Sequence, residues 1–109
     1  MTYIEVSDMI RSFDFPYNYY QFPKGAAVDP PFVVFYFPDS DDFVADNKNY
    51  SGIRQLVIEL YTDNKDFQAE ATIEETLEAN EIPYTRTEIY IEDEQLFEVA
   101  YEMEVLING

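Results

Sequence analysis

Four aspartates lie within nine positions of one short segment, and carboxylate oxygens are the ligands that Ca²⁺ prefers. The segment reads PDSDDFVADNKNY and spans residues 38–50. An EF-hand loop has oxygen ligands at positions 1, 3 and 5, glycine at position 6 and glutamate at position 12. Counted from Asp39, position 3 is Asp41, but Phe43 and Val44 stand where the loop needs an oxygen and a sharp turn. The spacing therefore argues against an EF-hand.

The same segment has a simpler interpretation as a solvated connection between two strands. In that interpretation the aspartates stay in water, and Phe43 packs on the sheet or on a neighbouring molecule. A looser cation site made of Asp39, Asp41 and Asp42 is the alternative that the residue types leave open. We favour the solvated connection, so the sequence predicts no metal site.

A ladder of glutamates near the C-terminus is the second group that could do chemistry. It consists of Glu98, Glu102 and Glu104. Residues two apart on a strand project from one face about 6.8 Å apart, which is near the separation of a glycosidase carboxylate pair. Such a hydrolase also requires a cleft and one desolvated carboxyl group with a raised pKa. We favour a solvated sheet face, or the wall of an assembly, over a carboxylate-pair hydrolase.

The residue types that most often carry nucleophilic and acid–base catalysis are missing from the sequence. It contains no histidine and no cysteine. Its three glycines, at positions 25, 52 and 109, are too scattered to form a phosphate-binding loop or a dinucleotide fingerprint. Without cysteine there is also no disulfide and no thiolate zinc site. We therefore expect a protein that is not an enzyme, with no catalytic residue and no cofactor.

Tyrosine is the most unusual part of the composition, with 10 tyrosines and 9 phenylalanines among 109 residues. Most of these rings are expected to fill the core of a sheet protein, although each buried hydroxyl needs a hydrogen-bond partner. Tyrosine is also enriched at protein interfaces. We therefore expect some of the tyrosines to line a contact between subunits. The candidates are Tyr17, Tyr19, Tyr20, Tyr36, Tyr50, Tyr61, Tyr84, Tyr90 and Tyr101.

The charge balance argues against two classes of partner. The sequence has 23 acidic and 6 basic residues, a formal net charge of −17. No face of such a protein can be broadly basic, so nucleic-acid phosphates and anionic membrane surfaces repel it. The sequence also contains no apolar run long enough to span a membrane, and its N-terminal residues do not resemble a secretory signal. We expect no sequence-specific nucleic-acid binding and no membrane contact.

The apolar periodicity predicts a single α+β domain over residues 1–109, with its elements in the order α-β-β-β-α-β-β. A capping box from Thr2 to Glu5 opens an amphipathic helix over residues 3–13. Asp66 is placed to cap a second helix, in which apolar residues recur every four positions. Both helices are expected to pack on the sheet.

About five strands are expected in a mostly antiparallel sheet. They span residues 17–22, 32–37, 53–61, 84–91 and 97–107. The strand over residues 32–37 is apolar on both pleat faces, so it is expected in the centre of the sheet with cover on both sides. The last two strands are expected to form a hairpin through residues 92–95.

Several phrases, in order along most of the chain, resemble a family of bacteriophage proteins. The phrases are DPPF before the apolar strand, FVADNKNY, IELYTDNKDFQAE and the C-terminal YIEDEQLFEVAYEMEV. Together they resemble the tail terminator, or tail completion, proteins encoded in the head–tail gene cluster of long-tailed phages and prophages of Gram-positive bacteria.

The resemblance implies a structural role in the virion. Such proteins are α+β domains that form a ring, commonly a hexamer, which caps the finished tail tube and joins it to the head connector. Their partners are therefore further copies of themselves, the tail tube and the head connector proteins, and their location is the head–tail interface after synthesis in the bacterial cytoplasm.

Two general arguments agree with a ring around DNA. A domain of this length has a radius of gyration of about 13 Å, too small for one copy to surround a DNA duplex. Negative charge also keeps passing DNA from sticking.

Two alternatives remain open beside the tail terminator. One is a neighbouring role in the same gene cluster, as another head–tail connector or a minor capsid protein. The other is an acidic DNA mimic that inhibits a nucleic-acid-binding protein, which the net charge of −17 suggests. A mimic should carry its carboxylates at phosphate-like spacing over one outer surface. Carboxylates scattered around the molecule would remove the basis for that alternative.

Overall fold

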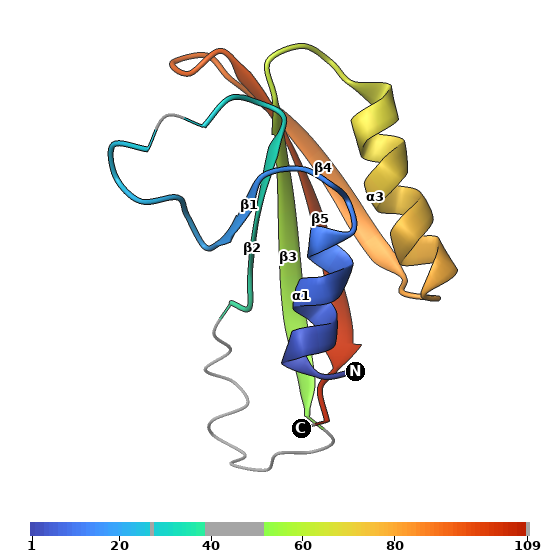
Figure 1. Ribbon diagram of the computed structural model, residues 1–109. Helices are drawn as coiled ribbons and strands as arrows, with labels where there is room; N and C mark the ends of the chain where they lie inside the picture. Colours follow the sequence, from blue (N-terminus) through green and yellow to red (C-terminus); the bar gives the residue numbers. More distant parts are fainter. Residues whose placement is uncertain (27, 39–51, 109) are drawn as a thin grey trace.

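The computed structural model describes residues 1–26, 28–38 and 52–108, and within them it confirms the predicted α+β class and order of elements (Figure 1). Within the described residues, two helices pack on a five-stranded, mostly antiparallel sheet. The elements are α1 (Tyr3–Arg11), β1 (Tyr17–Tyr19), β2 (Phe32–Tyr36), β3 (Ile53–Thr62), α3 (Phe67–Ala79), β4 (Tyr84–Ile91) and β5 (Leu96–Leu106).

The strands lie in the order β1-β2-β3-β5-β4, so β1 and β4 form the two edges of the sheet. β1 runs parallel to β2, and the remaining pairings are antiparallel. The longest pairing joins β3 to β5, from Ile53 opposite Leu106 to Thr62 opposite Phe97. The predicted hairpin at residues 92–95 joins β4 to β5.

Both helices cover one face of the sheet, which we call the helix face; the opposite side is the outer face (Figure 1). Because successive residues of a strand point to opposite sides, the alternation in β3 assigns each side chain to a face. Leu56, Ile58 and Leu60 are fully buried on the helix face. Val57 and Glu59, between them in sequence, therefore belong to the outer face.

Both helices begin at the caps that the sequence predicts. The hydroxyl of Thr2 accepts the Glu5 N–H at 3.1 Å, and the Glu5 carboxylate accepts the Thr2 N–H at 2.7 Å, which completes the capping box of α1. The carboxylate of Asp66 accepts the Ala69 N–H at 3.0 Å and caps α3. Satisfying these free N–H groups fixes where each helix starts and which stripe it turns toward the sheet.

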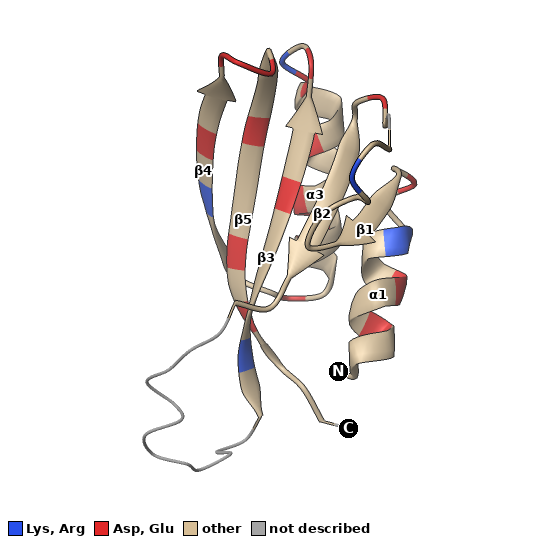
Figure 2. Cartoon of the chain, turned by 90° about the vertical axis from the view of Figure 1, so that its left-hand side faces the viewer, with Lys and Arg blue, Asp and Glu red and all other residues tan. Residues whose placement is uncertain are grey.

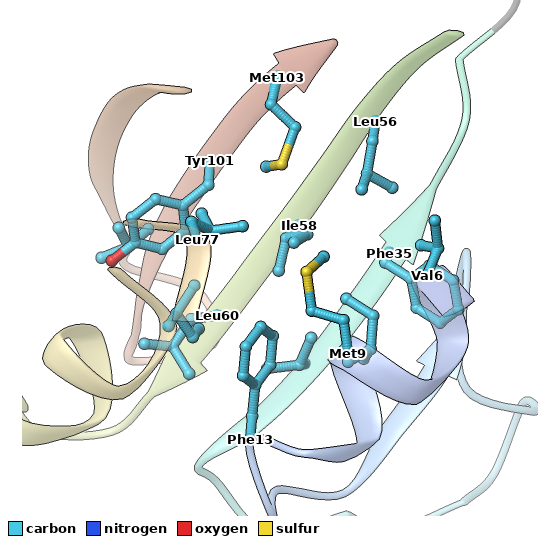
Figure 3. Close-up of a cluster of buried hydrophobic side chains, with 14 of the residues drawn as sticks. Val6, Met9, Phe13, Phe35, Leu56, Ile58, Leu60, Leu77, Tyr101 and Met103 are labelled. Atoms are coloured by element: carbon cyan, nitrogen blue, oxygen red, sulfur yellow. The ribbon is translucent and has the colours of Figure 1, made fainter. Parts of the chain in front are cut away.

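A single cluster of buried apolar side chains fills the space between the helices and the sheet (Figure 3). α1 contributes Val6, Met9 and Ile10, and α3 contributes Ile73 and Leu77, all of them buried. Figure 3 shows side chains from α1, α3, β2, β3 and β5 directed into this cluster. Burying one such side chain contributes about 1.5–3 kcal/mol relative to leaving it exposed, so the cluster holds the helices against the sheet.

Two predicted bounds are wrong at the N-terminal side of the domain. The strand expected over residues 17–22 ends at Tyr19, because Tyr20 adopts a φ of 69°, a left-handed conformation that cannot continue a strand. The helix expected over residues 3–13 ends at Arg11, and Asp14 then turns the chain with a φ of 67°.

The apolar strand β2 is second in the sheet, and the middle strand is β3, so the predicted central position is only partly right. β2 still has a strand on either side, and Val33, Val34 and Phe35 are buried on its two faces, as the apolar pattern predicts. Its outer face receives cover from the chain that follows β1. Within that segment, Phe22 lies 5.4 Å from the ring of Phe32.

Candidate functional site

Tyrosine hydroxyls and glutamate carboxylates form a hydrogen-bonded network on the outer face. Glu59 of β3 accepts the hydroxyl of Tyr36 at 2.9 Å and the hydroxyl of Tyr61 at 2.8 Å. The Tyr61 hydroxyl also lies 2.6 Å from a carboxylate oxygen of Glu98 on β5. A hydroxyl has a single proton to donate. Two protons therefore serve three hydroxyl–carboxylate contacts, and both carboxylates retain capacity to accept further bonds.

Strand pairing brings this network together from three separate parts of the sequence. Tyr61 stands opposite Glu98 on one side and opposite Phe32 on the other. Glu59 and Tyr61 are two residues apart on β3, so both project from the outer face. The sequence places each residue correctly on a strand, but the register that aligns them depends on the folded sheet.

Burial raises the pKa of Tyr61 above its usual value, and its hydrogen bonds to Glu98 and Glu59 raise the pKa further. Burial and the bond to Glu59 likewise raise the pKa of Tyr36. Both hydroxyls therefore remain protonated donors at neutral pH, and neither can act as a base there. The network is negatively charged through its carboxylates alone.

An open hollow of about 680 Å³ adjoins the network, between the segment after β1 and the β4–β5 hairpin. Five aromatic rings line it, and most of them contact one another. Phe32 stacks on Tyr61 with ring centroids 5.0 Å apart and receives the edge of Phe22 at 5.4 Å. The ring of Tyr20 meets Tyr36 edge-on at 5.6 Å. The rings thus form two contacting groups, Tyr20 with Tyr36 and Phe22 with Phe32 and Tyr61, along the hollow.

The charge inside the hollow is negative. Glu59 and Glu94 both line it, and none of the lining residues in the described part of the chain is basic. Figure 2, in which the strands lie in front of the helices, shows further acidic positions on β5 and at the hairpin. The combination of aromatic rings and carboxylates suits a cationic group.

A second polar network lies on the helix face between α3 and β4. Glu70 of α3 is only 5% exposed, and it pairs with Lys65 and Arg86, each at 2.6 Å. Glu88 pairs with the same two cations, at 2.7 Å from Lys65 and 3.1 Å from Arg86. Each carboxylate in this network meets a cation, so the buried charge is compensated within the molecule.

The same network reaches the core through Glu74 of α3. Glu74 accepts the hydroxyl of buried Tyr101 at 2.8 Å and lies 3.3 Å from the guanidinium of Arg86. Burial raises the pKa of Tyr101, and the bond to Glu74 raises it further. Burial lowers the pKa of Arg86, but its bonds to Glu70 and Tyr101 outweigh that effect and raise it overall.

Sequence reasoning missed this helix-face network, although the pattern contains a signal for it. Ala69, Ile73 and Leu77 mark the buried stripe of α3, and Glu70 adjoins that stripe instead of the solvated side. A glutamate in that position needs a cation from the sheet. Arg86 is the basic residue of β4, and its register opposite Tyr101 aims it at the helix face.

The acidic segment lies almost entirely outside the described residues. This holds for Asp39, Asp41, Asp42 and Phe43, and for Tyr50 at its end. Within the residues that the structure describes, no group of three histidine, cysteine, aspartate or glutamate side chains is arranged to hold a metal ion. The looser cation site therefore stays an untested alternative.

The glutamate ladder divides into two parts. Glu98 belongs to the outer-face network through its contact with Tyr61. Glu102 and Glu104 point from the same face of β5 but are exposed to solvent, beyond the network. A glycosidase pair needs one desolvated carboxyl group, and exposure keeps these two carboxylates in water.

The tyrosines divide between the core, the outer-face network and the edges of the sheet. Tyr101 is fully buried, and Tyr84 meets it edge-on with ring centroids 5.5 Å apart. Tyr19 on β1 is 49% exposed and Tyr90 on β4 is 48% exposed, so each edge strand presents one tyrosine to solvent. Tyr19 packs against Phe35 and accepts the Phe37 N–H with its hydroxyl, and Tyr90 packs against Phe97, so only the exposed part of each side chain is available for a subunit contact. Tyr17 is half-buried at the start of β1.

One tyrosine that the sequence analysis did not single out also has a defined contact. Tyr3 of α1 accepts a hydrogen bond from Arg54 at 2.6 Å and packs edge-on against Phe37 at 5.2 Å. The guanidinium of Arg54 lies over the Phe37 ring, 5.3 Å from its centroid. Here the molecule binds one of its own cations with an aromatic ring and a tyrosine oxygen.

β4 is an edge strand of eight residues with an exposed surface. Residues 85–90 are all exposed, and Ile89 and Tyr90 are 54% and 48% exposed. The strand contains neither proline nor glycine, and its charged residues Arg86 and Glu88 are engaged by the helix-face network. Natural sheets usually protect a long edge with free charges or prolines, so this edge is suited to pairing.

Comparison with models of known protein families, with curated proteins and with solved structures gave no match. The resemblance to tail terminator proteins therefore stays a prediction. Among the described residues, no helix is both long enough and apolar enough to cross a membrane.

Proposed function

We propose that this protein is a non-enzymatic structural component of a phage or prophage virion, of the tail terminator kind, that acts by self-association. The viral assignment is supported by the ordered phrases from DPPF to YIEDEQLFEVAYEMEV. The observation that carries self-association is the exposed edge strand β4. It presents backbone N–H and C=O groups on its outer side, next to the exposed side chains of Ile89 and Tyr90.

Ring formation requires a heterologous contact, in which one surface of a subunit meets a different surface of the next. The two edges of the sheet offer such a pair. β4 of one copy can add to the β1 side of its neighbour, so that main-chain hydrogen bonds continue the sheet around the ring. Tyr19 and Tyr90 would then lie near each junction, consistent with the enrichment of tyrosine at interfaces.

In this proposal the ring, commonly a hexamer in the family that the sequence resembles, caps the tail tube and meets the head connector. The net charge of −17 supports passage of DNA through such a ring, because like charges repel. A neighbouring head–tail role would use the same edge-to-edge assembly. Only the position in the virion would differ.

Light scattering coupled to size-exclusion chromatography, at several protein and divalent-ion concentrations, tests the assembly. We expect a concentration-dependent oligomer, promoted by divalent ions that screen the carboxylates of adjacent subunits. Ile89→Lys should abolish it by placing a charge on the pairing edge. Ile4→Lys is the matched control, because Ile4 is 73% exposed but belongs to α1. A monomer under every condition would contradict self-association, and equal loss in both variants would contradict the β4 edge.

Deletion of the gene from a phage that encodes it tests the viral role. Loss of a tail terminator should give tails of abnormal length that fail to join heads. Tails of normal length that remain unjoined would indicate another head–tail joining role. Normal-length tails joined to heads would remove the terminator role altogether.

The DNA-mimic alternative rests on the net charge of −17. The described carboxylates lie on both sides of the molecule: Glu75 and Glu78 on α3, and Glu102 and Glu104 on the outer face of β5. A single phosphate-like array on one surface is thus not favoured, and we rank this function second. Binding to a basic DNA-binding protein that moderate salt abolishes, with no higher oligomer, would reverse the ranking.

A further inference from the structure

We infer that the outer-face hollow binds the guanidinium group of an arginine from a basic segment of a partner protein. This inference depends neither on ring formation nor on a viral origin, because the hollow lies on the outer face and not along the edge of β4. Its basis is the chemistry of the lining: aromatic rings beside carboxylates, with no basic side chain among the described lining residues.

The rings provide the first requirement, a surface on which a planar cation can lie. Phe32 and Tyr61 stack with an interplanar angle of 17°, and Phe22 and Tyr20 add their rings at the sides. A cation near the face of such a ring is attracted by its quadrupole. Guanidinium is planar and less strongly hydrated than ammonium, so its plane can lie flat on an aromatic face, which a compact ammonium group cannot do.

The carboxylates provide the second requirement, oxygen acceptors that the fold leaves incompletely satisfied. Glu59 and Glu98 share the single proton of Tyr61, and Tyr36 supplies the other hydroxyl proton. A guanidinium has five N–H donors and no acceptor. It can therefore add the donors that the network lacks, by charge-assisted bonds to Glu59 at the floor of the hollow or to Glu94 at its rim.

Related chemistry occurs elsewhere among the described residues, where the protein's own cations lie over aromatic rings. Arg54 lies over Phe37 and donates to Tyr3. Lys65 lies over the ring of Phe67, 4.9 Å from its centroid, while pairing with glutamates. The outer-face hollow combines rings and carboxylates as the Lys65 site does, but its described lining supplies no cation. An arginine from outside completes the pattern.

Tyr20, at the rim of the hollow, is held in a left-handed conformation that is costly for a bulky residue. Its φ is 69°, and the residue is 63% exposed. A hydrogen bond of 2.8 Å from its N–H to the carbonyl of Phe35 fixes the backbone. Residues with a strained backbone often lie at binding sites, and this strain does not serve to bury the side chain. Here it directs an aromatic ring to the hollow, against Tyr36.

Titration of the ¹⁵N-labelled protein with N-acetyl-arginine amide, followed by amide chemical shifts, tests the inference. N-acetyl-citrulline amide is the control probe, because it has nearly the same shape without the charge. We expect saturable shifts at Gln21, Val34, Glu59 and Ile91 around the hollow. Citrulline amide should bind about tenfold more weakly, since it lacks both the cation–π and the charge-assisted interactions.

Two variants and one matched control complete the test. Glu59→Gln removes the charge and keeps one of the two oxygens that accept the tyrosine hydroxyls, while its NH2 group can donate to the oxygen of the other hydroxyl. It should weaken arginine amide binding about fivefold or more. Glu104→Gln removes an exposed charge from the same face and should leave binding unchanged. Tyr20→Gly removes the ring and relieves the positive φ, so it should weaken binding while the protein stays folded.

Three results would overturn the inference. Equal binding of the arginine and citrulline amides would show an apolar or aromatic site without selectivity for a cation. Shifts spread over the acidic surface, with Glu59→Gln and Glu104→Gln equally affected, would show general charge attraction. Concentration-dependent shifts at the hollow without any probe, abolished on dilution, would show that a second copy of this chain occupies it.

Discussion

The two faces of the sheet use the same pair of residue types, tyrosine and glutamate, to opposite effect. On the helix face Tyr101 donates to Glu74, and Arg86 lies beside that carboxylate. On the outer face Tyr61 donates into Glu59 and Glu98, and no described cation joins them. In the first network every carboxylate contacts a cation, whereas in the second no described cation contacts either carboxylate.

This difference suggests that the helix-face network stabilises the fold and that the outer-face network is suited to recognising a ligand. A buried carboxylate such as Glu70, 5% exposed, is tolerable only because Lys65 and Arg86 accompany it. The outer-face carboxylates adjoin an open hollow, so water can solvate them until a ligand arrives. We therefore expect mutations on the helix face to change stability, and comparable mutations on the outer face to change binding.

The largest effect is expected for Arg86→Met, which keeps the length of the side chain and removes its charge. Glu70 would remain buried with Lys65 alone, and Glu74 would lose its cation. Breaking a fully buried pair costs about 3–5 kcal/mol. Since the Arg86 side chain is 35% exposed, we expect a loss of about 2–4 kcal/mol in the free energy of unfolding, measured by urea denaturation.

Arg11→Met is the control for that substitution. Arg11 pairs with Asp8 across one turn of α1, and both side chains are more than half exposed. Exposed pairs of this kind contribute about 0–1 kcal/mol. Equal losses for the two variants would mean that the helix-face network contributes no more than a surface ion pair, and the contrast between the faces would fail.

The second prediction concerns alkaline pH and applies to both faces. Burial and bonds to glutamate raise the pKa of Tyr101 and of Tyr61 in the folded protein. Their stabilising contribution is therefore complete below the unfolded-state pKa of about 10, and it is lost as pH rises through the folded-state pKa. Above about pH 10, each group should lower the free energy of unfolding by up to about 1.4 kcal/mol per pH unit.

Urea denaturation between neutral pH and the alkaline limit of folding measures that slope. Tyr101→Phe and Tyr61→Phe should each make the slope shallower, whereas Tyr90→Phe, an exposed ring on β4, should leave it unchanged. If neither buried variant altered the alkaline slope, the hydroxyl–carboxylate bonds would not favour the protonated tyrosine over the ionised one in the folded protein. A change for Tyr101 alone would show that the outer-face bonds are too solvated to matter.

The class of the fold and the start of each helix were predictable from the sequence because they depend on local signals. The Thr2–Glu5 capping box and the Asp66 cap both form as expected. The end of β1 was not predictable in the same way, since an aromatic run favours a strand at every position. Tyr20 leaves the strand because its backbone bonds to Phe35, a contact decided by tertiary structure.

The candidate site was predictable in its parts but not in its arrangement. The sequence analysis named Tyr36 and Tyr61 as candidates for a subunit contact and Glu98 as part of a possible carboxylate pair. It did not predict that they form one network. Glu59 is a polar residue on the outer face of a strand, and nothing in the sequence marks it as part of a site. Only the pairing of β2, β3 and β5 places Glu59 between two tyrosine hydroxyls. Cross-strand register is a long-range property, and a single sequence does not determine it locally.

A smaller effect on stability is expected for Glu59→Gln than for any change in the helix-face network. The amide oxygen of glutamine can still accept one of the two tyrosine hydroxyls, and its NH2 group can donate to the oxygen of the other. The change also reduces repulsion with nearby Glu98. We expect the free energy of unfolding to change by less than about 1 kcal/mol. Glu70→Gln, the matched change on the helix face, should cost about 2 kcal/mol or more. Similar losses would show that the outer-face network is structural and not reserved for a ligand.

The smallest change in stability, and the sharpest test of the contrast, is expected for Tyr20→Gly. Glycine adopts a positive φ without steric cost, which gains about 1–2 kcal/mol relative to a residue with a Cβ atom. It also loses more conformational entropy on folding, by about 0.5–1 kcal/mol, and the contact with Tyr36 disappears. These terms nearly cancel, so the free energy of unfolding should stay within about 0.5 kcal/mol of the parent protein. A loss of several kcal/mol would mean that the Tyr20 ring is part of the packed structure, because a ring held free for binding contributes little to the stability of the fold.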